Sequence, residues 1–254
     1  MSAAEQQRPG EGVSAEGGAA HVGPDTGAAA PAGGGPEPMV GAARLRPDQS
    51  VIFRADPANP THRERLLEAM ADSIREHGFR GSTVADVVRR ARTSRRTFYQ
   101  HFADREACFL DLFDAMNTVL STYIAAALDP SATWQEQVDL AIGVYIDEVL
   151  AEPELTVACV REIPALGEAG LRAQHDEIER FADLLMALVV LVGQTDPHVA
   201  PLPRSTAVMI TGGLRELIAH SAVGSTEPVD PAELKGAAST VIKAVLDPAG
   251  RGGG

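Results

Sequence analysis

The 254-residue chain has few cysteines and no long apolar run, and both shortages exclude classes of protein. Cys108 and Cys159 have neither the spacing of a metal site nor that of a disulfide framework, so we interpret both as core residues. The best apolar candidate, residues 184–192, is only nine residues long, whereas a membrane-spanning helix needs about 18 or more. We therefore expect a protein of the reducing cytoplasm with no membrane partner.

Motifs for catalysis and for cofactor binding are also missing. The sequence contains no nucleophile elbow, no phosphate-cradling glycine loop and no metal-ligand spacing. The glycine runs at 33–35 and 252–254 lie in low-complexity ends of the chain. Because catalysis needs a nucleophile, a base and oxyanion donors in one pocket, we expect neither an enzyme nor a bound cofactor or metal.

Lysine is nearly absent, since only positions 235 and 243 carry it, and almost all positive charge is therefore arginine. The formal net charge is -13, yet residues 54–105 carry 11 basic and 7 acidic groups. Five of the eight residues from Arg89 to Arg96 are arginine. A GC-rich genome explains the preference for arginine but not its clustering. An acidic chain with one basic cluster has a local positive field there, which indicates a nucleic-acid partner.

The composition divides the chain into segments. Residues 1–58, and most clearly the first 41, are rich in Gly, Ala and Pro with few large apolar side chains, which predicts a disordered extension. Its acidic excess argues against a DNA-binding arm and favours a spacer. We expect a DNA-binding domain over 59–103, a regulatory and dimerisation domain over 104–247, and a flexible tail over 248–254.

Helical periodicity dominates the remainder, and no segment alternates in the manner of a strand, so the predicted fold is all-α. Thr61 and Glu64 are spaced as a capping box, and Gly78 follows the apolar face of that first helix. Ser82 or Thr83, Ser94 and Asp104 are the candidate caps of the next three helices. Further helices are predicted at about 133–151, 153–162, 168–193, 203–222 and 231–247.

Residues 61–102 supply a supporting helix, a positioning helix and a recognition helix, which are the parts of a helix-turn-helix that reads the major groove. Phe98 and Phe102 are four residues apart and are expected to face inward. The segments that match a known pattern are Arg65-Leu66-Leu67-Glu68-Ala69, His77-Gly78-Phe79, Thr83-Val84-Ala85-Asp86-Val87, Ala91, Ser94-Arg95, Thr97-Phe98-Tyr99-Gln100-His101-Phe102 and Asp104-Arg105-Glu106-Ala107. Over about residues 61–115 the chain resembles the TetR/AcrR family of transcriptional regulators.

The resemblance implies a set of DNA contacts. Thr83, Tyr99, His101 and Arg105 match groups that contact the DNA backbone in this family, and Arg95, Arg96 and Thr97 match positions near base edges. An arginine there can bond guanine N7 and O6 and contribute roughly 1–3 kcal/mol of discrimination. The full set of expected DNA-binding residues is Thr83, Thr93, Ser94, Arg95, Arg96, Thr97, Tyr99, His101 and Arg105.

Two positions depart from the family pattern. The usual turn glycine is Arg92, which must either adopt a left-handed conformation at a cost of roughly 1 kcal/mol or give the turn another shape. The usual apolar residue after it is Thr93, whose methyl group can enter the core while its hydroxyl faces outward.

The resemblance also implies a C-terminal domain that dimerises and holds a small molecule. The dimerisation candidates are the helices at 203–222, where Gly212-Gly213 permits close approach, and at 231–247. Among the helices of 104–193, the residues that can line a pocket are Phe113, Met116, Trp134, Tyr145, Cys159, His175 and Phe181. For each of these residues, core packing is the favoured explanation from sequence. The charged residues Arg172, His175, Asp176, Glu177, Glu179 and Arg180 are expected to form a solvated face.

These features predict a sequence-specific DNA-binding transcriptional regulator. The resemblance implies a dimeric repressor that binds a near-palindromic operator in double-stranded DNA and is released by an unidentified small hydrophobic effector. Two alternatives stay open: a ligand-independent regulator whose C-terminal domain only dimerises or binds a protein, and an activator.

Overall fold

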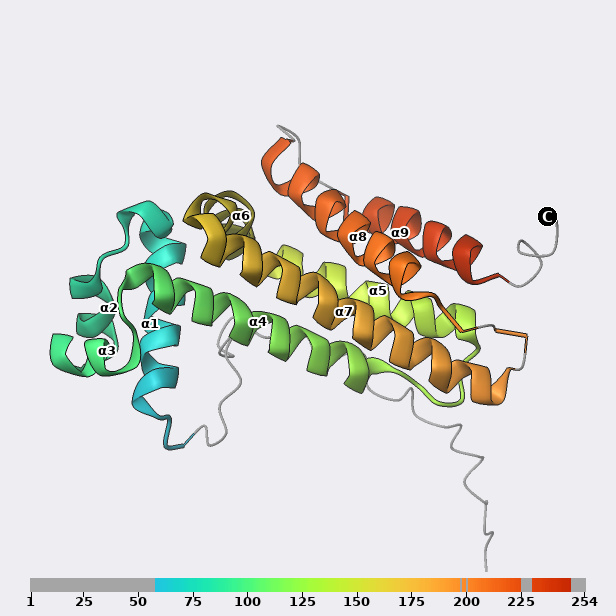
Figure 1. Cartoon of the computed structure of the whole chain (residues 1–254), viewed down its shortest axis with the longest axis horizontal. Helices are drawn as coiled ribbons and strands as arrows, with labels where there is room; N and C mark the ends of the chain where they lie inside the picture. Colours follow the sequence, from blue (N-terminus) through green and yellow to red (C-terminus); the bar gives the residue numbers. More distant parts are fainter. Residues whose placement is uncertain (1–57, 197, 200, 225–229, 248–254) are drawn as a thin grey trace, which may run out of the picture. The chain divides into compact units, whose positions relative to one another are not determined.

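The computed structural model describes residues 58–196, 198–199, 201–224 and 230–247, and within these it contains helices and no strand (Figure 1). The helices are α1 (His62–Gly81), α2 (Val84–Arg90), α3 (Arg95–His101), α4 (Arg105–Ala127), α5 (Trp134–Ala151), α6 (Pro153–Glu162), α7 (Gly167–Thr195), α8 (Arg204–Gly224) and α9 (Pro231–Leu246), with a 3-10 turn, η1 (Pro164–Leu166), before α7. The all-α prediction is confirmed. The expected disordered extension (1–58) and flexible tail (248–254) lie outside the described residues, apart from Ala58.

Side-chain caps determine where the first helices begin. Thr61 and Glu64 form the predicted capping box, with the Thr61 hydroxyl accepting from the Glu64 N–H and the Glu64 carboxylate accepting from the Thr61 N–H. Thr83, not Ser82, caps α2, because the buried Ser82 hydroxyl donates instead to the Gly78 carbonyl at 2.9 Å. Gly78 has the expected positive φ, 67°, but it kinks α1 where the sequence predicts an end, and the helix runs on to Gly81.

The turn between α2 and α3 keeps the geometry that a glycine would give it. Arg92 has a φ of 49°, so it adopts the left-handed conformation itself, and the alternative of a differently shaped turn is wrong. The Thr93 N–H donates to the Val88 carbonyl at 3.0 Å, and the Ser94 hydroxyl accepts from the Thr97 N–H at 3.1 Å to start α3.

One apolar core joins the helix-turn-helix to α4 and α6. Phe98 of α3 and Val87 of α2 are fully buried in the same cluster as Leu66 of α1, Phe109 of α4 and Leu155 of α6. The rings of Phe79 and Phe109 stack with centroids 4.2 Å apart. Apolar packing therefore crosses the predicted domain boundary at 103/104, although the boundary itself stays a prediction.

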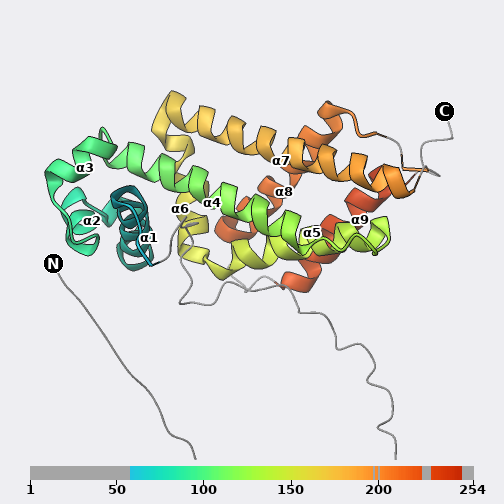
Figure 2. The same ribbon diagram turned by 90° about the horizontal axis from the view of Figure 1, so that it is seen from below.

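A second core lies among α5, α7, α8 and α9. Ile146, Ala182, Ala207 and Ile242 are buried in it, one from each of the four helices. Figures 1 and 2 both show α1–α3 at the N-terminal end of α4, with α7 running beside α4. Gly170 permits α7 to approach the end of α6, since a Cβ there would lie 1.8 Å from the Ile163 carbonyl oxygen. In the part of the chain that is described, no helix is long and apolar enough to cross a membrane.

The strained turn gives the first prediction. Arg92→Gly removes the cost of a left-handed non-glycine residue, and we expect it to raise the free energy of unfolding by about 0.5–1 kcal/mol in urea denaturation. Arg92→Ala is the matched control, because it removes the same charge but keeps a Cβ. A glycine variant no more stable than the alanine variant would show that this turn is unstrained.

Candidate nucleic-acid interface and internal cavity

The recognition helix α3 is anchored on one side and open on the other. Phe98 is fully buried and Phe102 is 5% exposed, so the two rings fix α3 against α1 and α4. Arg95, Arg96 and Tyr99 lie on the exposed side. This arrangement leaves the first turn of α3 with solvent-facing guanidinium groups, as the sequence predicts.

The five clustered arginines fall into two groups. Arg89 pairs with Asp86 at 3.3 Å, and Arg90 pairs with Glu76 of α1. The hydrogen bond from Arg90 is the main reason that the pKa of Glu76 is lowered from its ordinary value. Within the described residues, Arg92, Arg95 and Arg96 have no carboxylate within ion-pair distance, and all three are exposed. These three therefore carry positive charge that is available to an anionic partner.

The hydroxyl groups of the site are placed by the helix caps. Thr83 is exposed at the start of α2, where its hydroxyl accepts from the Asp86 N–H and donates to the Asp86 carboxylate at 2.6 Å. That hydrogen bond is the first cause of a lowered Asp86 pKa. Ser94 and Thr97 lie 2.9 Å apart, oxygen to oxygen, and Thr93 and Thr97 are half-buried. Ser94 is exposed, so it can be both a cap and a contact.

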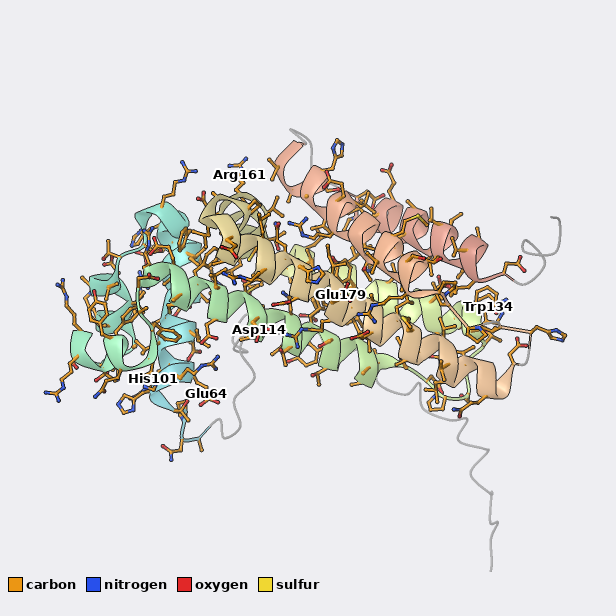
Figure 3. The ribbon with its side chains drawn as sticks, in the orientation of Figure 1. Glu64, His101, Asp114, Trp134, Arg161 and Glu179 are labelled. Carbon is orange, nitrogen blue, oxygen red and sulfur yellow. The ribbon has the colours of Figure 1, made fainter. Side chains whose placement is uncertain are left out.

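Tyr99 and His101 complete the exposed face. The Tyr99 side chain is 57% exposed, and its ring meets the edge of Phe98 with centroids 5.4 Å apart. His101 is exposed at the last residue of α3 and points away from the helices in Figure 3. The structure thus brings Arg95, Arg96, Tyr99 and His101 onto one short helix, with Thr83 at the start of the neighbouring α2.

Arg105, a predicted contact to the DNA backbone, makes contacts within the protein at the start of α4. Its guanidinium group lies over the Phe79 ring, 4.4 Å from the centroid, and donates to the Ser82 carbonyl at 2.9 Å. It also pairs with Glu106 at 2.8 Å. These internal contacts tie the start of α4 to the α1–α2 connection, so the structure gives Arg105 a positioning role.

A cavity lies between α4, α5, α6, α7 and α8. It contains about 840 Å³ of non-protein space, part of it open to solvent. Four of the predicted lining residues meet there: Phe113 and Met116 from α4, Tyr145 from α5 and Cys159 from α6. Burial raises the pKa of the Tyr145 hydroxyl and of the Cys159 thiol, so both are neutral at physiological pH.

Three of the predicted pocket residues lie elsewhere. Phe181 packs edge to face against Tyr145, with ring centroids 5.9 Å apart. Both residues line a second, neighbouring cavity. Trp134 lines a third cavity and lies at the end of the helices far from α1–α3 (Figure 3). His175 lines none of these three cavities and is exposed on α7. Helical periodicity could not tell which face of α7 turns inward there.

Charged residues that the sequence pattern did not indicate also line the cavity. Glu177, predicted to be solvated, is largely buried and accepts a hydrogen bond from Arg215 of α8 at 3.2 Å. Burial raises the pKa of Glu177 to about 7, against the opposing effect of Arg215. Glu148 and Glu152 line the same cavity. Arg215, which lies within the apolar stripe of α8, was the one feature of the sequence that indicated a charged site in this cavity.

Comparisons with known proteins agree with this geometry. Residues 66–112 match the family model described as bacterial regulatory proteins, tetR family. A Bacillus subtilis (strain 168) protein, the uncharacterized HTH-type transcriptional regulator YhgD, is 24% identical over 115 residues. That match covers 45% of this chain and spans only 60% of the length of YhgD.

Solved structures share the fold over a longer range. The fatty acid degradation regulator FadR from Bacillus halodurans has a TM-score of 0.60 at 16% identity, covering 72% of this chain and 95% of that one. FadR from Bacillus subtilis, solved in complex with stearoyl-CoA, has a TM-score of 0.57 at 15% identity, covering 72% and 97%. At these identities the likeness concerns the fold. With the family match over residues 66–112, it leads to one conclusion: the chain carries the DNA-binding region of the tetR family of bacterial regulatory proteins.

Proposed function

We propose that the chain is a dimeric transcriptional repressor that binds a near-palindromic operator and releases it when a small, largely apolar effector enters the internal cavity. The observation that carries this proposal is the exposed face of α3. Arg95, Arg96 and Tyr99 point outward there, and the described residues place no carboxylate against either arginine. Guanidinium groups at the start of a recognition helix suit bidentate contact with guanine, and the neighbouring hydroxyls suit phosphate.

The proposed dimer interface is the outer face of α8 and α9. Met209 on α8 is 64% exposed and Val241 on α9 is 61% exposed. Gly212, Gly213 and Gly236 have open space where a Cβ would be, so another helix can approach closely at these points. A two-fold pairing of this face would present two recognition helices to one operator, as near-palindromic sites require.

The proposed effector response rests on linkage. The cavity is walled by α4 and α6, and these helices also pack in the core of the helix-turn-helix. A second conformation, in which the two recognition helices are placed differently, binds the operator poorly. A ligand that prefers this second conformation weakens DNA binding, by a factor set by the ratio of the ligand's affinities for the two conformations. A regulator without an effector would instead show no ligand-dependent change in operator affinity.

The DNA-binding proposal is tested by single alanine variants. We expect Arg95→Ala and Tyr99→Ala each to weaken binding to the intergenic DNA upstream of the protein's own gene by about 5–100-fold. The measurement is fluorescence anisotropy in the presence of unlabelled non-specific competitor DNA. Arg95→Ala should also lower the magnitude of the salt dependence by roughly one released counterion.

Arg172→Ala is the matched control, because it removes an exposed arginine from α7 whose contact with Glu168 is a surface pair at 3.5 Å. It should leave the operator affinity unchanged. Unaltered affinity in both α3 variants, with thermal unfolding like that of the parent, would rule out α3 as the reading element.

The dimer proposal predicts that Val241→Glu separates the protomers. Two unpaired carboxylates would be buried at a two-fold interface, at a cost of roughly 3 kcal/mol or more, which raises the dimer dissociation constant at least about a hundredfold. Light scattering coupled to size exclusion should then report the monomer mass, and operator binding should fall with it. Leu171→Glu, at a side chain 60% exposed on α7, is the control that should stay dimeric. A dimeric Val241→Glu variant would place the interface elsewhere.

A further inference from the structure

Two ion pairs join α1 to α6. Arg75 donates to both carboxylate oxygens of Glu152, from Nε at 2.9 Å and from a terminal nitrogen at 3.0 Å. Five residues further along α1, Arg80 donates from Nε to both oxygens of Glu162 at 3.0 and 3.1 Å. Glu152 is the N-cap residue of α6 and Glu162 is its last residue, so the two pairs hold opposite ends of this helix to α1.

The two pairs differ in what else they touch. Glu152 is one of the residues that line the internal cavity, whereas Glu162 is not. The Arg75 and Glu152 side chains are 30% and 23% exposed, but the Arg80 side chain is 81% exposed. One carboxylate, Glu152, thus belongs both to the wall of the cavity and to the attachment of the helix-turn-helix.

The charges around this cavity favour a positively charged guest. Its walls are mainly apolar and aromatic, and the carboxylates of Glu148, Glu152 and Glu177 line it, against Arg215 as the only arginine or lysine among the lining residues. Arg215 is already hydrogen-bonded to Glu177. Glu152 is paired with Arg75, which does not line the cavity, so an ammonium guest can take the place of that guanidinium group, whereas an anionic guest cannot.

We propose that the cavity binds an apolar organic cation, and that this cation acts by replacing Arg75 as the counter-ion of Glu152. The inference rests on the proposed function, because it names the effector class and the coupling contact of that repressor. Both Glu152 oxygens are engaged by Arg75, so the guest and the guanidinium group compete for one carboxylate.

The competition links the cavity to DNA binding. When Glu152 turns to the guest, Arg75 keeps its contact with Asp72 on α1, at 2.8 Å, and is not left without a counter-ion. The helix-turn-helix then loses one of its two ion pairs to α6, and the conformation that binds DNA is less favoured. By reciprocity, operator DNA weakens binding of the cation by the same factor.

The test compares three probes that share a decyl chain: decyltrimethylammonium, decanol and decanoate, all below their micellar concentrations. Binding to the DNA-free full-length protein is measured by isothermal titration calorimetry. We expect saturable binding with decyltrimethylammonium tightest and decanoate weakest. Decanoate binding more tightly than the ammonium probe, or no saturable binding of the ammonium probe, would overturn the proposed ligand class.

Substitutions of Glu152 and of Arg75 should change the affinity for decyltrimethylammonium in opposite directions. Glu152→Gln removes the carboxylate, so decyltrimethylammonium should bind roughly tenfold more weakly. Arg75→Gln removes the competitor and leaves the carboxylate, so the same probe should bind several-fold more tightly. A merely structural role for the pair predicts shifts of the same sign, and that result would overturn the coupling contact.

Glu162→Gln is the matched control, because it breaks the other pair between the same helices away from the cavity, and it should leave the probe affinity unchanged. With operator DNA in anisotropy, the ammonium probe should lower the affinity of the parent and of Glu162→Gln, but not that of Arg75→Gln. If neither the parent nor any variant binds operator, the proposed function fails. The direction of the affinity changes in calorimetry still decides the ligand class and whether the probe competes with Arg75 for Glu152.

Discussion

The structure depends above all on the apolar core that α1 shares with α4 and α6. Leu66 and Leu67 of α1, Phe109 of α4 and Leu155 of α6 are fully buried together, and Phe98 anchors the recognition helix in the same cluster. Because interiors pack densely, α3 cannot change its position without a response from α4 or α6. These two helices also form part of the cavity wall. A single packed core thus connects the helix that we propose to read DNA to the internal cavity.

The clustered arginines fall into a group paired with carboxylates and a group exposed to solvent. Arg89 pairs with Asp86 within α2 and Arg90 ties α2 to Glu76 of α1, whereas Arg92, Arg95 and Arg96 are exposed to solvent. The rest of the chain is acidic, which limits non-specific adhesion to nucleic acid. A small basic face on an acidic protein favours a partner that matches the geometry of that face over any polyanion.

The helix boundaries could be predicted from sequence because short-range chemistry sets them. Caps at Thr61, Ser94 and Asp104 act on donors three residues away, and Gly78 supplies the positive φ. Which way a long helix turns its charged residues depends on distant packing. That is why Glu177, expected in a solvated face, lines the cavity, while His175 of the same face is exposed. The internal contact of Arg105 depends on distant packing too, since its carbonyl partner Ser82 lies 23 positions earlier in the chain.

The central claim is that a two-fold dimer reads DNA through α3. Selection of bound sequences from a random DNA library, followed by footprinting of the enriched sequences, tests it most directly. A two-fold dimer that reads the major groove through α3 should enrich an inverted repeat and protect two half-sites about one helical turn apart, roughly 10–10.5 base pairs centre to centre. Failure to enrich any sequence, or enrichment of a single unsymmetrical site, would contradict the account.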